Sequence, residues 1–461
     1  MQKILLFIAS LFYFNSLFAK NEIKSWQGIH ETPLSRLEQQ FADPPVEFAN
    51  HVIWGWEGKM DKKTICNDLD SIKKKGFRAV IFEAGYKLPF KYLSEEWFKA
   101  IRTGVLEAKK RGMKVWIIDE GKYPSGFAGG KFSQERPDLR MQALVIGDTI
   151  QVKRGEVMTN HKIAPEIISA VAVSTSGAPN RTVAINNGEI SFNAGLDDWK
   201  ILLVKSDFRT AVTRAVNNPN GGKDATNSLC DYLNPVAVQQ FIDWTHEQYK
   251  KYLGKELGTT VLGFRGDEPD YAHLPWTPSI VQTFKDTKGY DPTPYLASFF
   301  TTSPTIQEQR VKADYWDVWS SLFATHFFKL QADWCAANGV AHITHLNKEH
   351  EMPACVKAEG DYFRNLSKVQ IPGVDAIWNQ IWPGTLNDFP KLASSVAHVY
   401  GKPRAFSESF AAYHISPTIP QAKFVVDHQI ARGINFFEFM FWPAGSKHRN
   451  WMSDPGMKGL N

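Results

Sequence analysis

The chain has 461 residues, of which 43% are hydrophobic and 22% are charged, an ordinary composition for a globular protein. Its formal net charge is only +5 and the basic residues are spread along the chain, which argues against a nucleic-acid partner. This length can bury a large core and exceeds one typical barrel domain, so an extra module or long loops are expected.

The N-terminus is typical of a cleavable secretory signal over residues 1–19. A basic start is followed by an apolar run over residues 4–18 and by the small residue Ala19. Asn15 and Ser16 interrupt this run, which makes it too short for a membrane span. The sequence therefore predicts a secreted or periplasmic protein without a membrane span.

Strand-like and helix-like segments alternate in the next part of the chain. Residues 51–56, 77–82 and 113–118 are short apolar runs of the kind that forms buried strands. Between them, apolar residues recur at helical spacing after Asp61 and again over residues 95–111. Three such strand–helix units predict a parallel sheet in an α/β protein.

The pattern then changes to alternating apolar and polar residues with Gly and Asn turns, as in residues 184–190. This predicts a small inserted β-rich module over residues 141–207, after the third strand. Residues 20–140 would form the first part of a catalytic barrel, and residues 208–461 would form the remainder.

Helical character resumes at Asn234-Pro235, a cap followed by proline in the first helical position. Five more strands alternate with helices, and they are expected over residues 259–264, 340–346, 374–380, 403–407 and 434–442. Eight strand–helix units predict a (β/α)8 TIM-type barrel in the α/β class.

Two glutamates follow strands on opposite sides of such a barrel. Glu268 comes after the fourth strand and Glu408 after the seventh, while Glu438 lies inside the eighth and is the weaker candidate. Active sites of these barrels form at the carboxyl ends of the strands. Glycoside hydrolysis needs one acid to protonate the leaving oxygen and a second carboxylate to attack the sugar or to activate water. We therefore expect Glu268 and Glu408 to be the catalytic residues.

Other acids also stand at predicted strand ends. Glu83, Asp119 and Glu120 follow the second and third strands, and each could bind sugar hydroxyls or form a structural ion pair. Asp267 and Asp270 could line the site or cap the next helix.

Histidine and tryptophan side chains are the remaining candidates. His342 and His345 are three apart on a predicted strand and so point to opposite faces, which argues against a zinc site. His345 and Asn347 are better placed to bind substrate by hydrogen bonds. At least two strand-end tryptophans are expected to form the walls of a sugar pocket and the others to be core, from the set Trp54, Trp56, Trp378, Trp382 and Trp442.

Several short blocks resemble, in order and spacing, the catalytic barrel of glycoside hydrolase family 106, the α-L-rhamnosidase-like enzymes. The similarity covers most of residues 45–445. The blocks are Trp54-Gly-Trp56, Asp68-Leu-Asp70, Gly76, Glu83, Tyr123-Pro-Ser-Gly126, Gly129-Gly130, Asp231-Tyr-Leu-Asn-Pro235, Asp267-Glu-Pro269, Gly289-Tyr-Asp291, Tyr400-Gly401 and Ser407-Glu-Ser-Phe410.

The resemblance implies a secreted bacterial exo-hydrolase that removes a terminal deoxy sugar from a polysaccharide by an inverting route, with Ca2+ at the site. By motif match, Glu268 would be the general acid and Glu408 the general base. A further acid that helps to hold the metal is expected near residues 375–380, where Asn379 or Gln380 stands instead. The metal site is therefore left open. Family members also carry β-sandwich modules after the barrel, so this chain would be a short form or a fragment.

Alternatives remain: a carbohydrate-binding barrel without catalysis, a glycosidase with another sugar specificity, and a metal-dependent hydrolase centred on His345. Retention and inversion also stay open, because acids after strands four and seven are common in retaining barrels.

The side chains expected to bind substrate are Trp54, Trp56, Glu83, Glu120, Asp267, His345, Asn347, Trp378, Asn379 and Trp442.

Overall fold

The computed structural model describes residue 28 and residues 32–121, 123–212, 225–271, 273–385, 387–413 and 417–445. The signal segment expected over residues 1–19 lies outside this part of the chain. Among the described residues, no helix combines the length and the apolar character that crossing a bilayer requires.

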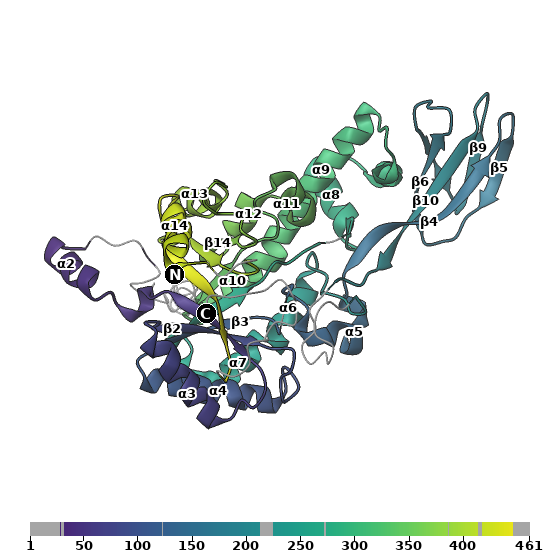
Figure 1. Cartoon of the computed structure of the whole chain (residues 1–461). Coiled ribbons are helices and arrows are strands. Elements are labelled where there is room, and N and C mark those ends of the chain that lie inside the picture. Colours follow the sequence, from purple (N-terminus) through teal and green to yellow (C-terminus); the bar gives the residue numbers. More distant parts are fainter. Residues whose placement is uncertain are drawn as a thin grey trace, which may run out of the picture.

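A closed barrel of eight strands forms the centre of the molecule, with the order β1-β16-β15-β14-β13-β11-β3-β2 (Figure 1). Every neighbouring pair in it is parallel, which confirms the predicted parallel barrel. The strands are β1 (His51–Trp56), β2 (Ala79–Ala84), β3 (Lys114–Ile118), β11 (Val261–Gly266), β13 (Ala341–Thr344), β14 (Ile371–Ala376), β15 (Phe406–Ser409) and β16 (Phe436–Pro443).

Helices precede each barrel strand from β2 onward and cover the outside of the barrel. The first of them, α3, begins at its cap Asp61, whose carboxylate accepts a hydrogen bond from the Thr64 amide at 2.9 Å. Its apolar face of Ile65, Leu69 and Ile72 is buried, as helical spacing predicts.

The α-helices are α2 (Leu34–Ala42), α3 (Lys62–Lys74), α4 (Glu95–Lys110), α5 (Lys131–Glu135), α6 (Pro235–Trp244), α7 (His246–Leu253), α8 (Ile280–Lys288), α9 (Ile306–Leu322), α10 (Lys329–Ala337), α11 (Met352–Glu359), α12 (Tyr362–Leu366), α13 (Pro390–Val399) and α14 (Ile419–Ile430). A π-helical stretch, η7 (Phe323–Phe328), joins α9 to α10. The short 3-10 helix η6 (Thr293–Phe300) precedes α9.

The sixth barrel strand, β14, lies about three residues earlier than the sequence predicts. It ends at Ala376, and Trp378 and Asn379 follow it with φ angles of 56° and 58°. These left-handed conformations are incompatible with a strand, so both residues belong to the loop after it. The shift brings Asp375 to the end of the strand.

Between β3 and α6 the chain forms two antiparallel sheets that project away from the barrel (Figure 1). Trp199, Ile201 and Leu203 of β10 belong to a separate core with Phe192, whereas Leu202 and Val204 join the core that extends into the barrel helices. The strands of these sheets are β4 (Gln142–Val152), β5 (Val157–Lys162), β6 (Ile167–Ser174), β7 (Arg181–Val183), β8 (Ile185–Asn186), β9 (Glu189–Asn193), β10 (Trp199–Phe208) and β12 (Pro275–Trp276).

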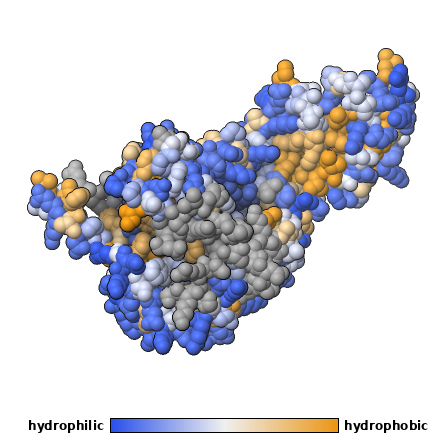
Figure 2. Space-filling model, viewed as in Figure 1, coloured by the Kyte–Doolittle hydropathy of each residue, from blue (hydrophilic) through white to orange (hydrophobic). Residues whose placement is uncertain are grey.

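In this region the apolar colour gathers over the part of the sheet of β4, β6 and β10 that lies nearest α8 and α9 (Figure 2). Ile146 on β4 and Phe208 on β10 are among the exposed apolar side chains of these strands. Hydrophilic residues cover much of the described barrel surface in the same view. In this view, the apolar patch therefore lies on the projecting sheets.

Two of the short sequence blocks meet behind the barrel mouth. Gly126 has a φ of +93°, and a Cβ at this position would lie 2.5 Å from the ring of Tyr232. The Tyr232 hydroxyl in turn donates a hydrogen bond to the carbonyl oxygen of Ser125. Only glycine permits this close approach, which explains the residue pattern of the turn.

Candidate active site

A cavity of about 370 Å³ opens at the carboxyl ends of the barrel strands. Half of its lining is apolar, with Ile53, Ile118 and Met440 coming from strands β1, β3 and β16. The acidic side chains that line it are Glu83, Asp267, Glu268, Asp270, Asp375 and Glu408. Such a site is apolar in its walls and acidic at its centre.

Glu268 and Glu408 line the same cavity although 140 positions separate them along the chain. Glu408 lies on β15, and Glu268 follows β11 in a loop. The φ of Glu268 is +38°, an unfavourable conformation for a residue other than glycine. Such strain is tolerated when the surrounding structure holds the residue in place, and it is common at functional sites.

The pKa of Glu268 is raised to about 7. The main cause is burial, which disfavours the charged form, and the negative charges of Asp267 and Glu408 act in the same direction. A hydrogen bond with Asp375 and the charge of His345 oppose the shift. Glu268 can therefore carry a proton near neutral pH, which a general acid must do.

Asp375 is paired with Glu268 inside the cavity. Oxygen atoms of Glu268 and Asp375 and a nitrogen of His345 all lie within 4.8 Å of one another. Burial raises the pKa of Asp375 well above its usual value, and the charge of Glu408 adds to this effect. Two carboxyl groups this close are most stable when they share a proton.

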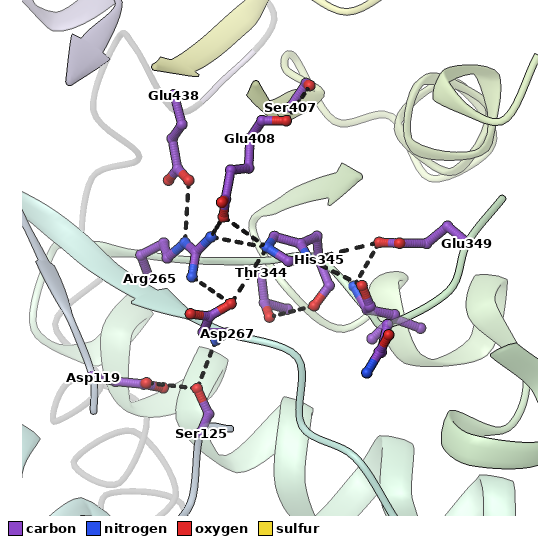
Figure 3. Close-up of polar contacts among 12 residues, drawn as sticks. Asp119, Ser125, Arg265, Asp267, Thr344, His345, Glu349, Ser407, Glu408 and Glu438 are labelled. Carbon is purple, nitrogen blue, oxygen red and sulfur yellow. Dashed lines mark hydrogen bonds and ion pairs between the residues drawn. The ribbon is translucent and has the colours of Figure 1, made fainter. Parts of the chain in front are cut away.

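Arg265 is one of the lining residues of the cavity, and it contacts three carboxylates (Figure 3). Its Nη1 is 2.7 Å from Asp267 Oδ1, its Nε donates to Glu438 Oε2 at 3.1 Å, and its Nη2 donates to Glu408 Oε2. The side chain is fully buried. The guanidinium thus holds the carboxylate of Glu408 in place inside the cavity.

His345 contacts the same oxygen of Glu408, at 3.2 Å from Nε2. Burial and the Arg265 charge act to lower the pKa of His345, but the hydrogen bond to Glu408 and the charges of Asp375 and Glu349 outweigh them and raise it well above the usual value. His345 Nε2 also lies 2.8 Å from Arg265 Nη2, so His345, Arg265 and Glu408 form one buried polar cluster.

Strand register explains why these groups meet. Asp375 on β14 is paired with Glu408 on β15, and Glu408 is paired with Glu438 on β16. Glu438 is in turn paired with His51 on β1, and the two side chains lie 3.2 Å apart. Four neighbouring strands thus place polar side chains at one level of the barrel.

The turn after β3 uses its acids for structure. Glu120 Oε1 accepts hydrogen bonds from the amides of Gly121 at 2.7 Å and Gly129 at 2.9 Å, and its Oε2 accepts one from Ala128. Glu120 is 1% exposed and does not line the cavity. The prediction that Glu120 binds substrate is therefore wrong, because three backbone amides occupy its carboxylate.

Asp119 also acts within the protein. Its Oδ1 accepts a hydrogen bond from the Ser125 hydroxyl at 2.7 Å, and that hydroxyl oxygen accepts one from the Asp267 amide at 2.6 Å (Figure 3). This chain of contacts ties the turn after β3 to the loop that carries Glu268.

Most of the predicted sugar-binding tryptophans do not reach the cavity. Trp54 and Trp56 are 0% exposed, and their rings pack edge to face 5.2 Å apart. They belong to the core between the barrel and α3 and α4, since Trp54 Nε1 also donates to buried Asp68. Trp442 packs against the same core. The prediction that Trp54 and Trp56 bind substrate is corrected accordingly, whereas Trp442 is only partly buried and its role stays a prediction.

Other predicted residues lie at the cavity or next to it. Trp378 lines the cavity and is 46% exposed, so its ring is available to a ligand. Glu83, Asp267 and Asn347 also line it. Asn379 follows Trp378 in the same loop but is not among the lining residues. His345 is not among the lining residues but contacts Glu408, which is.

Two residues of the site, Arg265 and Asp375, were not among the expected ones, whereas Asp270 was expected either to line the site or to cap the next helix. Asp270 lines the cavity and its Oδ1 has no partner among the described residues, while burial raises its pKa. Arg265 is a charged residue inside an otherwise apolar strand, which is a usable sequence signal for a buried ionic site. Asp375 was missed because the sixth strand was predicted over residues 374–380, which put Asp375 near the start of the strand and not at its end.

A parallel barrel that brings two carboxyl groups together in one cavity at its mouth is an arrangement that glycoside hydrolases use. Residues 164–443 match the family described as alpha-L-rhamnosidase, glycoside hydrolase family 106. The match covers more than half of the chain, and the protein belongs to this family.

Individual relatives agree with this class. A curated protein of Formosa agariphila described as "Putative beta-glucuronidase" is 24% identical over 514 aligned positions, which cover 99% of this chain and 41% of that protein. The chain thus spans about two fifths of the length of this relative. The solved structure of a rhamnosidase from Novosphingobium sp. PP1Y is similar with a TM-score of 0.68 and 15% identity, over 91% of this chain and 57% of that one. This likeness shows the shared fold, and the family and its relatives support a glycoside hydrolase.

Proposed function

We propose that this chain is the catalytic barrel of an exo-acting glycosidase of the α-L-rhamnosidase type, which cleaves a terminal deoxy sugar from a polysaccharide or oligosaccharide. The observation that carries the proposal is the meeting of Glu268 and Glu408 in one cavity, one with a raised pKa and the other next to Arg265. Glu268 protonates the glycosidic oxygen, and Glu408 activates water for attack on the anomeric carbon.

The cavity supports a small, neutral sugar. Its volume of about 370 Å³ is near the low end for ligand sites, which run from roughly 300 to 1,000 Å³. Apolar side chains in its wall suit the methyl group of a deoxy sugar, and the ring of Trp378 offers a flat face for stacking.

The name of the Formosa relative raises a second candidate, a glucuronidase. A uronate carboxylate requires a cationic partner, and the lining residues include six acids and one arginine. The nitrogens of Arg265 are already engaged with Asp267, Glu408 and Glu438. The charge of the cavity therefore favours the neutral sugar.

The test compares Glu268→Gln and Glu408→Gln on aryl α-L-rhamnosides with good and poor leaving groups. We expect both variants to lose about 10²–10⁴-fold in kcat/KM on the poor leaving group. Because an acid is needed less when the leaving group is already stable as an anion, Glu268→Gln should recover activity on the good leaving group, whereas Glu408→Gln should not.

Glu351→Gln is the matched control, since this glutamate lies in the loop after β13 with 66% of its side chain exposed. It should keep wild-type turnover. Wild-type turnover in both of the other variants would refute the assignment of roles, and binding of rhamnosides without any hydrolysis would favour a carbohydrate-binding barrel.

Aryl glucuronides tested in parallel decide between the two sugar classes. The anomer released first, followed by NMR, tests the inverting route implied by the family.

A further inference from the structure

The resemblance to the rhamnosidase family implies calcium at the site, and two clusters contain the residue types that could hold a cation. One consists of Asp267, His345 and Glu408, and the other of Glu268, His345 and Asp375. Within each cluster, one donor atom from every residue lies within 4.8 Å of the others. Whether calcium fits depends on what else contacts those atoms.

In the first cluster, the place of a cation is taken by a side chain. Arg265 Nη1 is 2.7 Å from Asp267 Oδ1 and Nη2 contacts Glu408 Oε2. His345 Nε2 lies 3.5 Å from that same Asp267 oxygen and 3.2 Å from that same Glu408 oxygen. The guanidinium thus contacts the oxygens that a metal would use. Its Nε also donates to Glu438 at 3.1 Å, so one buried cation joins three carboxylates.

The second cluster lacks sufficient oxygen ligands. Calcium takes six to eight oxygen ligands at about 2.3–2.6 Å. Both ring nitrogens of His345 are engaged, Nδ1 with the Leu346 carbonyl at 3.0 Å and Nε2 with Glu408. Within this cluster, only the carboxyl groups of Glu268 and Asp375 then remain as ligands.

The loop where the family resemblance predicts a further acid does not supply one either. The side-chain oxygen of Gln380 accepts a hydrogen bond from the Ile377 amide at 3.1 Å, and its nitrogen lies 2.9 Å from His350 Nδ1. Gln380 therefore stabilises its own loop. The residues present do not fit calcium.

We propose that Arg265 replaces the divalent cation in this protein and holds Asp267, Glu408 and Glu438 in position, so that stability and turnover do not depend on calcium. Arg265 is a positioning residue, because it acts on substrate through Glu408. A guanidinium suits this place better than an ammonium, since its planar fork directs separate N–H groups to separate carboxylates.

The first experiment uses the wild-type protein and does not require turnover. The protein is treated with EDTA, its metal content is measured, and its melting temperature is recorded with and without calcium chloride. A ligand that binds only the folded state raises the melting temperature with its concentration. We expect no calcium in the purified protein and the same melting temperature in both conditions. Stoichiometric calcium, or a melting temperature that rises with calcium, would overturn the proposal.

The second experiment removes the resident cation. Arg265→Ala and the milder Arg265→Gln leave the three buried carboxylates without their partner, and both should melt at lower temperature than the wild type. Calcium chloride should now raise the melting temperature of these variants, because the carboxylate oxygens become free to bind it. The melting temperature of Arg265→Lys should not change with calcium, since lysine keeps a positive charge at this position. Arg111→Ala is the control, because it removes a cation that contacts two carboxylates, Asp70 and Glu107, outside the cavity lining, and it should gain no response to calcium.

A folded Arg265→Gln variant that ignores calcium would show that the guanidinium does not occupy a cation site, and it would overturn the proposal. If neither neutral variant folds, the wild-type measurement decides alone. The prediction for activity rests on the proposed function: the rate of hydrolysis of an aryl rhamnoside should be equal in EDTA and in calcium chloride. Absence of any hydrolysis would count against the proposed function, while the melting and metal measurements would still test Arg265.

Discussion

At the scale of single residues, the site is a set of buried ionisable groups whose charges depend on their neighbours. Burial and nearby negative charge raise the pKa values of Glu268 and Asp375. Arg265 and His345, in contrast, lie beside Glu408. Glu268 is thereby biased toward the protonated form, while Glu408 contacts Arg265 and His345. Chemically identical side chains thus acquire different roles from their surroundings.

This arrangement predicts a pH dependence for turnover. A general acid with a pKa of about 7 is protonated below that pH, so kcat/KM should fall as pH rises through about 7. The charge of Asp267 contributes to the raised pKa of Glu268, and Asp267→Asn should move this limb of the profile to lower pH. The measurement is kcat/KM on a substrate with a poor leaving group, from pH 5 to pH 9. A profile that stays flat across pH 7 would contradict Glu268 as the acid.

At the scale of elements, strand β14 decides the geometry of the site through one glycine. Gly373 is paired with Phe406 on β15, and a Cβ at residue 373 would lie 2.1 Å from the Phe406 ring. The close packing of these strands sets the register that places Asp375 next to Glu408. The sequence places Pro372-Gly373 before the sixth strand, because both residues usually interrupt strands, and the tertiary packing overrides that preference.

Gly373→Ala should therefore destabilise the protein by about 1–3 kcal/mol, since an overpacked core must shift its neighbours. Urea unfolding followed by tryptophan fluorescence measures the change. Phe406→Ala removes the ring that the new methyl group would meet, so the cost of Gly373→Ala should become smaller in the double variant. An equal cost in both backgrounds would show that the strand contact is not the cause.

At the scale of the whole molecule, the loop that carries Glu268 is anchored at both ends. It leaves the barrel at β11 and reaches β12, whose partner β4 belongs to the antiparallel sheets. The Leu144 amide on β4 donates to the Leu274 carbonyl at 3.0 Å, and Tyr271 donates to the Ala358 carbonyl at 3.1 Å. The projecting sheets and the barrel helices thus both hold a loop that contains a residue with positive φ.

Buried acids with raised pKa values also affect global stability. Burial raises the pKa of Asp231 to about 7 and those of Glu120 and Glu349 to about 8. The folded state binds their protons more tightly than the unfolded state, so their contribution is complete below about pH 4 and is lost as pH rises to about 8. The melting temperature should fall over this range. Asp231→Asn, which cannot ionise, should make the decline less steep, and an unchanged slope would contradict this origin.

Much of this architecture follows from local patterns. Runs of apolar residues that alternate with helical spacing predict a closed parallel barrel, and the acids at the strand ends include two residues that share its cavity. These features depend on periodicity and on the rule that barrel sites form at the carboxyl ends of strands, and both can be read from a single chain. The secretory signal, the domain boundaries and the catalytic roles remain predictions.

Only the tertiary structure decided which of these side chains are core and which face the cavity. Trp54 and Trp378 are both tryptophans near strand ends, yet the first is buried against the helices and the second lines the cavity. Arg265 and Glu438 are 173 positions apart, and barrel closure brings them within 3.1 Å. The periodicity of a sequence indicates which face a side chain occupies, but distances between remote residues depend on how the strands pair and close, and no local pattern encodes them.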